Sequence, residues 1–178
     1  GWVFLDKIMG HKLSAMGASI GAVVGLVAIT PAAGFVTIPH AMAIGIIASI
    51  VSNLVVSKFP KGKIDDALDV FACHGVGGMV GMLLTGVFAT KTVNAAGADG
   101  LFYGNPAFFF TQLKGALIVI TFSFVMSFII FKLINLVQPI RVTAEEEEEG
   151  LDASQHDEKY SQGTLILATT GEEVANTF

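Results

Sequence analysis

The sequence predicts an all-α, polytopic membrane protein. Hydrophobic residues make up 53% of the chain, charged residues only 14%, and the mean hydropathy is +0.70. The segments Leu13–Ser57 and Val70–Thr90 contain no Asp, Glu, Lys or Arg. Because a helix needs roughly 20 apolar residues to cross a bilayer, both segments are long enough to span. Lipid is therefore the expected solvent for most of the chain.

Hydropathy and helix-breaking residues together place four spans, at about 14–30, 39–57, 69–90 and 106–137. The first should end at Pro31–Gly34, because proline and glycine interrupt helical backbone bonding. The third should begin at the acidic cluster Asp65–Asp69, whose side chains suit a helix amino end. The fourth should follow Asn105–Pro106 and would be roughly 48 Å long at 1.5 Å per residue, so it must tilt or protrude.

The amino end, Gly1–Leu5, has no methionine and no signal-peptide pattern. It resembles the end of a helix that begins upstream, so we expect the chain to be a fragment. Residues 1–141 then form a transmembrane domain fragment and residues 142–178 an acidic tail.

Loop charges predict the orientation in the cell membrane. The loops at 6–12 and 58–68 hold two and three lysines, whereas the loops at 30–38 and 91–105 hold none and one. By the positive-inside bias, the lysine-rich loops and the tail are cytoplasmic. Lys114 is the exception inside a span, and near the outer end of a tilted helix it can reach the headgroups.

The tail has one basic and ten acidic residues. Glu145–Glu149 repel one another, so charge alone favours a solvated linker there.

Small residues recur at a spacing of four in two spans: Gly17, Gly21 and Gly25 in the first, and Cys73, Gly77, Gly81 and Thr85 in the third. Such rows let helix backbones approach closely in lipid. We favour helix packing over substrate contact for both rows.

His74 is the main candidate for function. It lies within the charge-free third span, beside Phe71, Val80 and several glycines. Its ring needs a hydrogen-bond partner or a cavity there, and desolvation favours the neutral imidazole, which donates from one nitrogen and accepts at the other. Intramembrane ionisable groups are expensive and point to a pathway, so we favour function over structure.

Other chemistry has little support in the sequence. No second ligand stands three or four residues from His74, so no metal site is expected. Asp66 and Asp69 are expected to cap the third span rather than to contact a cation. His11 and His40 are expected to be solvated. The chain has no phosphate-binding loop or nucleophile elbow and only scattered basic residues, so no enzyme activity, cofactor or nucleic-acid binding is expected.

Three segments, in order, resemble the ammonium transporter family (Amt, with relatives Mep and Rh). They are Gly25–Gly34, Asp69–Gly81 and Glu149–Glu158. The resemblance extends to about Tyr160, and it implies that the chain holds the last five of eleven helices. Two inverted repeats would enclose a pore in each subunit of a homotrimer. The long fourth span would lie obliquely across the outer surface of these repeats.

The resemblance also implies roles for individual residues. His74 matches the second of two paired pore histidines, Phe71 is a candidate for the pore wall, and Asp66 and Asp69 match the acidic start of the same helix. Ammonium would lose its proton and cross as the neutral species beside the histidines. The regulatory tail motif corresponds to Gly150, Leu151, Asp152, His156 and Glu158, and a PII-type signalling protein could plug the pore.

One position departs from the family pattern. Asp157 stands where the tail motif has glycine, and a positive φ there would suit aspartate less well than glycine. Two other functions stay open at the level of sequence. They are an ammonium sensor that signals through the tail, and a proton-coupled carrier of another small solute.

Overall fold

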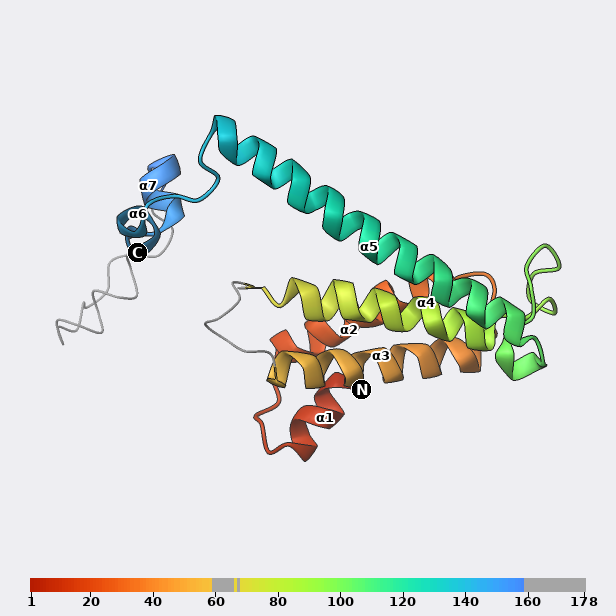
Figure 1. Ribbon diagram of the computed structural model, residues 1–178. Helices are drawn as coiled ribbons and strands as arrows, with labels where there is room; N and C mark the ends of the chain where they lie inside the picture. Colours follow the sequence, from red (N-terminus) through yellow and green to blue (C-terminus); the bar gives the residue numbers. More distant parts are fainter. Residues whose placement is uncertain (59–65, 67, 159–178) are drawn as a thin grey trace. The chain divides into compact units, whose positions relative to one another are not determined.

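A computed structural model describes residues 1–58, 66 and 68–158 (Figure 1). Every regular element in these ranges is helical, in agreement with the predicted all-α class. The chain divides into two compact units, residues 1–123 and 124–178, which are described separately. The division falls inside helix α5 (Pro106–Val137), because the side chains from Leu117 to Ile140 are all exposed. This division does not test where the membrane part ends, so the boundary at residue 141 stays a prediction.

The first unit is a bundle of packed helices. Helices α2 (Ala15–Ile29), α3 (Ile38–Lys58) and α4 (Gly77–Phe88) contact one another pairwise, and the short α1 (Trp2–Ile8) contacts α2 and α3 (Figure 1). The buried core consists mainly of small and branched side chains, which include Val24, Ala28, Ile44 and Ala48. Such side chains allow close helix packing in a membrane protein.

The first break between helices follows the sequence signals. The Ser14 Oγ accepts a hydrogen bond from the Gly17 N–H at 2.9 Å and caps α2. Helix α2 passes into the 3₁₀ turn η1 (Thr30–Ala32), which contains Pro31. Gly34 then takes a φ of +80°, which glycine adopts without a steric penalty.

Two of the glycines in the small-residue rows lie where helices touch. A Cβ on Gly21 would lie 2.6 Å from the Trp2 Cβ, and a Cβ on Gly81 would lie 2.8 Å from the carbonyl carbon of Ala28. Helix packing therefore explains Gly21 and Gly81. A Cβ on Gly25 would meet nothing within 4 Å.

The third span differs from the continuous helix that we expected over residues 69–90. It begins with the π-helix η2 (Phe71–Val76), and only from Gly77 does it continue as α4, to Phe88. A π-helix has a wider turn than an α-helix and often occurs at functional sites. Periodicity in a sequence does not reveal it, because the extra residue is accommodated only by packing. His74 lies on this turn.

Within the described residues, four helical segments are long and apolar enough to cross a membrane: Ala15–Ala32, Ile38–Lys58, Phe71–Phe88 and Pro106–Val137. Their order and number match the predicted fold class. The connection before α5 contains the 3₁₀ turn η3 (Leu101–Tyr103). Asp99 stabilises this connection. Its Oδ1 accepts a hydrogen bond from the Lys91 N–H at 2.9 Å and another from the Thr90 hydroxyl at 3.1 Å.

The tail in the second unit contains two short helices, α6 (Ala144–Glu149) and α7 (Leu151–His156), which contact each other. Glu145–Glu149 were expected to form a solvated linker; four of the five side chains are exposed, but the segment is helical. Thr143 and Glu146 form a reciprocal capping box, and Arg141 pairs with Glu147 at 2.9 Å. These local bonds offset the repulsion between the glutamates. Residues 159–178 lie outside the described part.

Candidate functional site

The start of the third span is organised by Asp66. Its Oδ1 accepts a hydrogen bond from the Val70 N–H at 2.8 Å, and its Oδ2 accepts one from the Phe71 N–H at 2.9 Å. These are among the first N–H groups of the span, which have no partner within the helix itself. Asp66 therefore caps the span. Asp65 and Ala67, which belong to the same acidic cluster in the sequence, lie outside the described residues.

Asp69 contributes through its backbone. It takes a φ of +53°, a left-handed conformation that aspartate tolerates better than most residues other than glycine. Its N–H donates to the Asp66 carbonyl at 3.2 Å, and its carbonyl accepts from the Cys73 N–H at 2.9 Å. The side chain of Asp66 and the backbone conformation of Asp69 together shape the start of the π-helix.

The π-helix presents two kinds of side chain. Ala72 and Cys73 are buried, whereas Phe71 and His74 are exposed. Within the described part of the chain, the His74 ring makes no hydrogen bond or ion pair. The sequence-based expectation of a cavity or hydrogen-bond partner for this ring stays a prediction. His74 thus lies at an open surface of a spanning segment that has no Asp, Glu, Lys or Arg.

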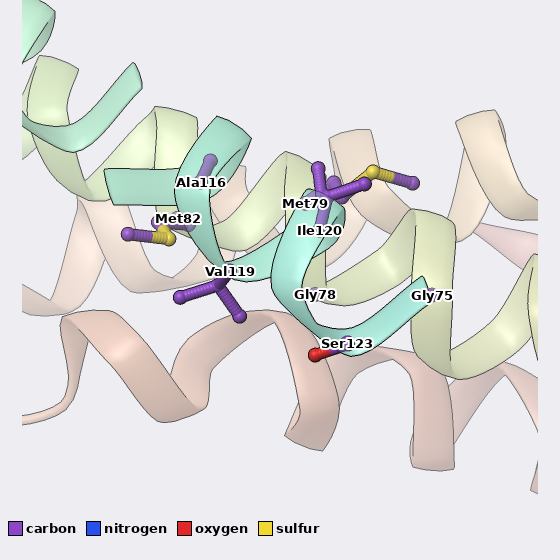
Figure 2. A pocket seen from close by; sticks show the side chains of 8 residues that line it. All are labelled: Gly75, Gly78, Met79, Met82, Ala116, Val119, Ile120 and Ser123. Carbon is purple, nitrogen blue, oxygen red and sulfur yellow. The ribbon is translucent and has the colours of Figure 1, made fainter. Parts of the chain in front are cut away.

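A groove runs between the third span and the first part of α5 (Figure 2). It encloses about 320 Å³ and is lined by Gly75, Gly78, Met79, Met82, Ala116, Val119, Ile120 and Ser123. One hydroxyl, that of Ser123, is the only polar side chain in this set. His74 does not line it. The groove therefore suits hydrocarbon rather than a polar solute.

Among the described residues, no group of three or more His, Cys, Asp or Glu side chains is placed to hold a metal ion.

The expectation that His40 is solvated was wrong. The imidazole stacks on Phe88, with ring centroids 4.7 Å apart and planes inclined by 12°. Its Nδ1 lies 3.1 Å from the Thr37 Oγ1 and 3.4 Å from the Tyr103 hydroxyl. No local signal reveals this cluster, because Tyr103 is 63 residues away in the chain. His11, by contrast, is exposed and lies 3.9 Å from Asp6.

The tail residues singled out by the sequence lie on and around α7. Gly150 precedes the helix with a φ of +100°, Leu151, Asp152 and His156 belong to it, and Glu158 follows it. Asp157 takes a φ of +53°, and its N–H donates to the Ala153 carbonyl at 3.1 Å. Aspartate therefore adopts the left-handed conformation that a glycine would favour here.

Comparison with known proteins gives a consistent result. Residues 1–160 match the model of the Ammonium Transporter Family. The chain is 46% identical over 166 residues to an ammonium transporter of Bacillus subtilis, covering 93% of this chain and 41% of that protein. It is 45% identical to one of Aquifex aeolicus, covering 89% and 37%.

Solved structures agree with these relatives. The crystal structure of Saccharomyces cerevisiae Mep2 is similar with a TM-score of 0.77 at 34% identity, covering 92% of this chain and 38% of that one. Candida albicans Mep2 gives a TM-score of 0.73 at 36% identity, covering 82% and 33%. The chain thus spans about two fifths of the length of the curated relatives that it matches.

Proposed function

Because this chain belongs to the ammonium transporter family, we propose that the complete protein moves ammonium or ammonia across the membrane, with His74 in the conducting path. One observation carries the proposal. His74 is exposed, without a partner among the described residues, on a π-helical turn of a charge-free spanning segment. An imidazole at such a place needs a polar neighbour, and a small polar solute supplies one.

The proposed mechanism uses the two nitrogens of a neutral imidazole. Ammonium gives up its proton to water outside the apolar passage, and the neutral molecule accepts a hydrogen bond from one ring and donates to the next. A second histidine, paired with His74 and contributed by another part of the complete protein, completes the path. Crossing as a neutral species avoids the cost of moving a charge through hydrocarbon.

Replacing His74 in the complete transporter tests this function. His74→Ala and His74→Leu are expected to impair methylammonium uptake or its coupling to protons, because both remove the ring nitrogens. Uptake would be measured in proteoliposomes, with His11→Ala as the control, since His11 is an exposed loop histidine. Unchanged uptake and coupling in a well-expressed His74 variant would falsify the proposal.

We also propose that three such subunits form a homotrimer, and that the tail lies in the cytoplasm where a PII-type protein can dock. The family match over residues 1–160 supports the homotrimer, and the resemblance of the tail segment Glu149–Glu158 supports the docking of a PII-type protein. Cross-linking of the complete protein in membranes would distinguish a trimer from other assemblies. Uptake of a panel of small solutes, measured in proteoliposomes, separates ammonium transport from transport of another small solute.

A further inference from the structure

The absence of a side chain at Gly75 leaves room for the ring of Phe71. A Cβ built on Gly75 would lie 3.1 Å from the Phe71 Cδ2 and 3.4 Å from its Cε2. Favourable separations between carbon atoms are about 3.5–4.0 Å, so the ring occupies the space that a methyl group would need. Residue 75 is also the immediate neighbour of His74.

Gly78 provides a natural comparison. It lies three residues further along the same span and lines the same groove as Gly75 (Figure 2). A Cβ on Gly78 would meet only the Val27 Cγ1, at 3.9 Å, which is an ordinary contact. The two glycines thus share their helix and their groove, but only Gly75 makes room for an aromatic ring.

Phe71 is held at a second point, through its backbone. Its N–H donates to the Asp66 Oδ2 at 2.9 Å, where the π-helix begins. The backbone bond fixes where the side chain starts, and Gly75 provides space for the ring. Phe71 is 50% exposed, so its ring lies at the surface of this helical unit and not in the buried core.

We propose that Gly75 is a positioning residue, which keeps the Phe71 ring at one place on the open face of the π-helix beside His74. The ring then limits the size of the solute that reaches the imidazole. This inference rests on the proposed function, since it assigns a role to Phe71 in the same path. It concerns the placement of one ring and not the chemistry at His74.

The test compares Gly75→Ala with Gly78→Ala in the complete transporter. Gly75→Ala displaces the ring by a few tenths of an ångström or more, so the ratio of methylammonium to ammonium transport is expected to change severalfold. Gly78→Ala should keep the wild-type ratio. Both ratios would be measured in proteoliposomes that contain matched amounts of monodisperse protein. A general loss of folding would lower both rates together and leave their ratio unchanged.

A double substitution identifies the cause. Phe71→Leu removes the ring, so Gly75→Ala added to Phe71→Leu is expected to change the ratio no further. Equal effects of Gly75→Ala and Gly78→Ala, or additive effects of Gly75→Ala and Phe71→Leu, would overturn the inference. Either result can occur while His74→Ala still impairs methylammonium uptake or its coupling to protons, so failure here is distinguishable from failure of the proposed function.

Discussion

At the scale of single residues, the most informative side chain after His74 is Asp66. One carboxylate accepts hydrogen bonds from two successive backbone N–H groups, those of Val70 and Phe71. Both groups would otherwise lack a partner in the first turn of the span. Asp66 thereby fixes the start of the turn that carries Phe71 and His74. Asp69, three residues further along, contributes a positive φ, and its side chain makes no hydrogen bond to the described residues.

Removing this cap should measurably destabilise the third span. Asp66→Ala leaves two N–H groups without their acceptor, and the loss of an N-cap costs about 0.5–2 kcal/mol. Thermal unfolding of the complete protein in detergent would show a lower midpoint for this variant. Asp66→Asn keeps an acceptor oxygen, so its unfolding midpoint should lie between those of Asp66→Ala and the wild type.

Asp69→Gly is the matched control for that experiment. Glycine adopts the positive φ of this position without strain, so the variant should unfold close to the wild type. A midpoint for Asp66→Ala equal to that of the wild type would show that the cap contributes nothing to stability.

At the scale of elements, the tail shows how local bonds outweigh charge repulsion. Thr143 and Glu146 satisfy each other's backbone N–H groups, at 2.8 Å for the Thr143 N–H and 3.3 Å for the Glu146 N–H. The Gln155 side chain donates to the Glu146 Oε1 at 3.1 Å and links α7 to α6. Helix α6 is therefore stabilised at its amino end, where negative side chains also suit the helix dipole.

The capping box makes the tail sensitive to acid. The hydrogen bond from the Thr143 backbone N–H, and then that from its hydroxyl, hold the pKa of Glu146 below its ordinary value of 4.5. A carboxyl whose pKa is lowered by folding stabilises the fold above its unfolded pKa, and this is lost as pH falls through the folded value. Hydrogen exchange of the α6 amides, corrected for intrinsic rates, should show protection at pH 7 that declines below pH 4.5. Thr143→Ala should reduce this protection already at pH 7.

Thr143→Ser is the control for the tail, because it keeps the hydroxyl that accepts from the Glu146 N–H. Protection in the Ser variant should match that of the wild type. If Thr143→Ala exchanges no faster than Thr143→Ser at pH 7, then the capping box does not hold α6 together.

At the scale of the whole molecule, the chain is a helical membrane protein, and its loop charges predict an orientation. The loops at 6–12 and 58–68 hold two and three lysines, whereas the loop at 91–105, which α5 separates from the tail, has one. Lysine-rich loops stay on the cytoplasmic side, so the 91–105 loop is predicted to face outside and the tail to face inside. This assignment is independent of the role of His74.

Cysteine labelling of intact cells tests the orientation. In a Cys73→Ala background of the complete protein, a cysteine replacing exposed Thr92 should react with a membrane-impermeant maleimide added outside. A cysteine replacing Ser154 in the tail should react only after permeabilisation. The reverse pattern would place the loop in the cytoplasm and contradict the predicted orientation.

The sequence by itself determined the solvent, the class of fold and the family. A long uninterrupted apolar segment predicts a spanning helix. Ser14, Pro31 and Asn105–Pro106 act on their immediate neighbours, so a short window of sequence reveals where the helices begin and end. The same applies to the acidic start of the third span, where Asp66 caps the helix that was predicted there.

Only the tertiary structure decided how these helices present their side chains. The π-helix at Phe71–Val76, the place of the Phe71 ring over Gly75 and the contact of His40 with Tyr103 are not visible in any sequence window. Each depends on packing between neighbouring turns or between segments far apart in the chain. Local propensity determines where a helix begins and ends, but the width of its turns and the direction of its side chains follow from what it packs against.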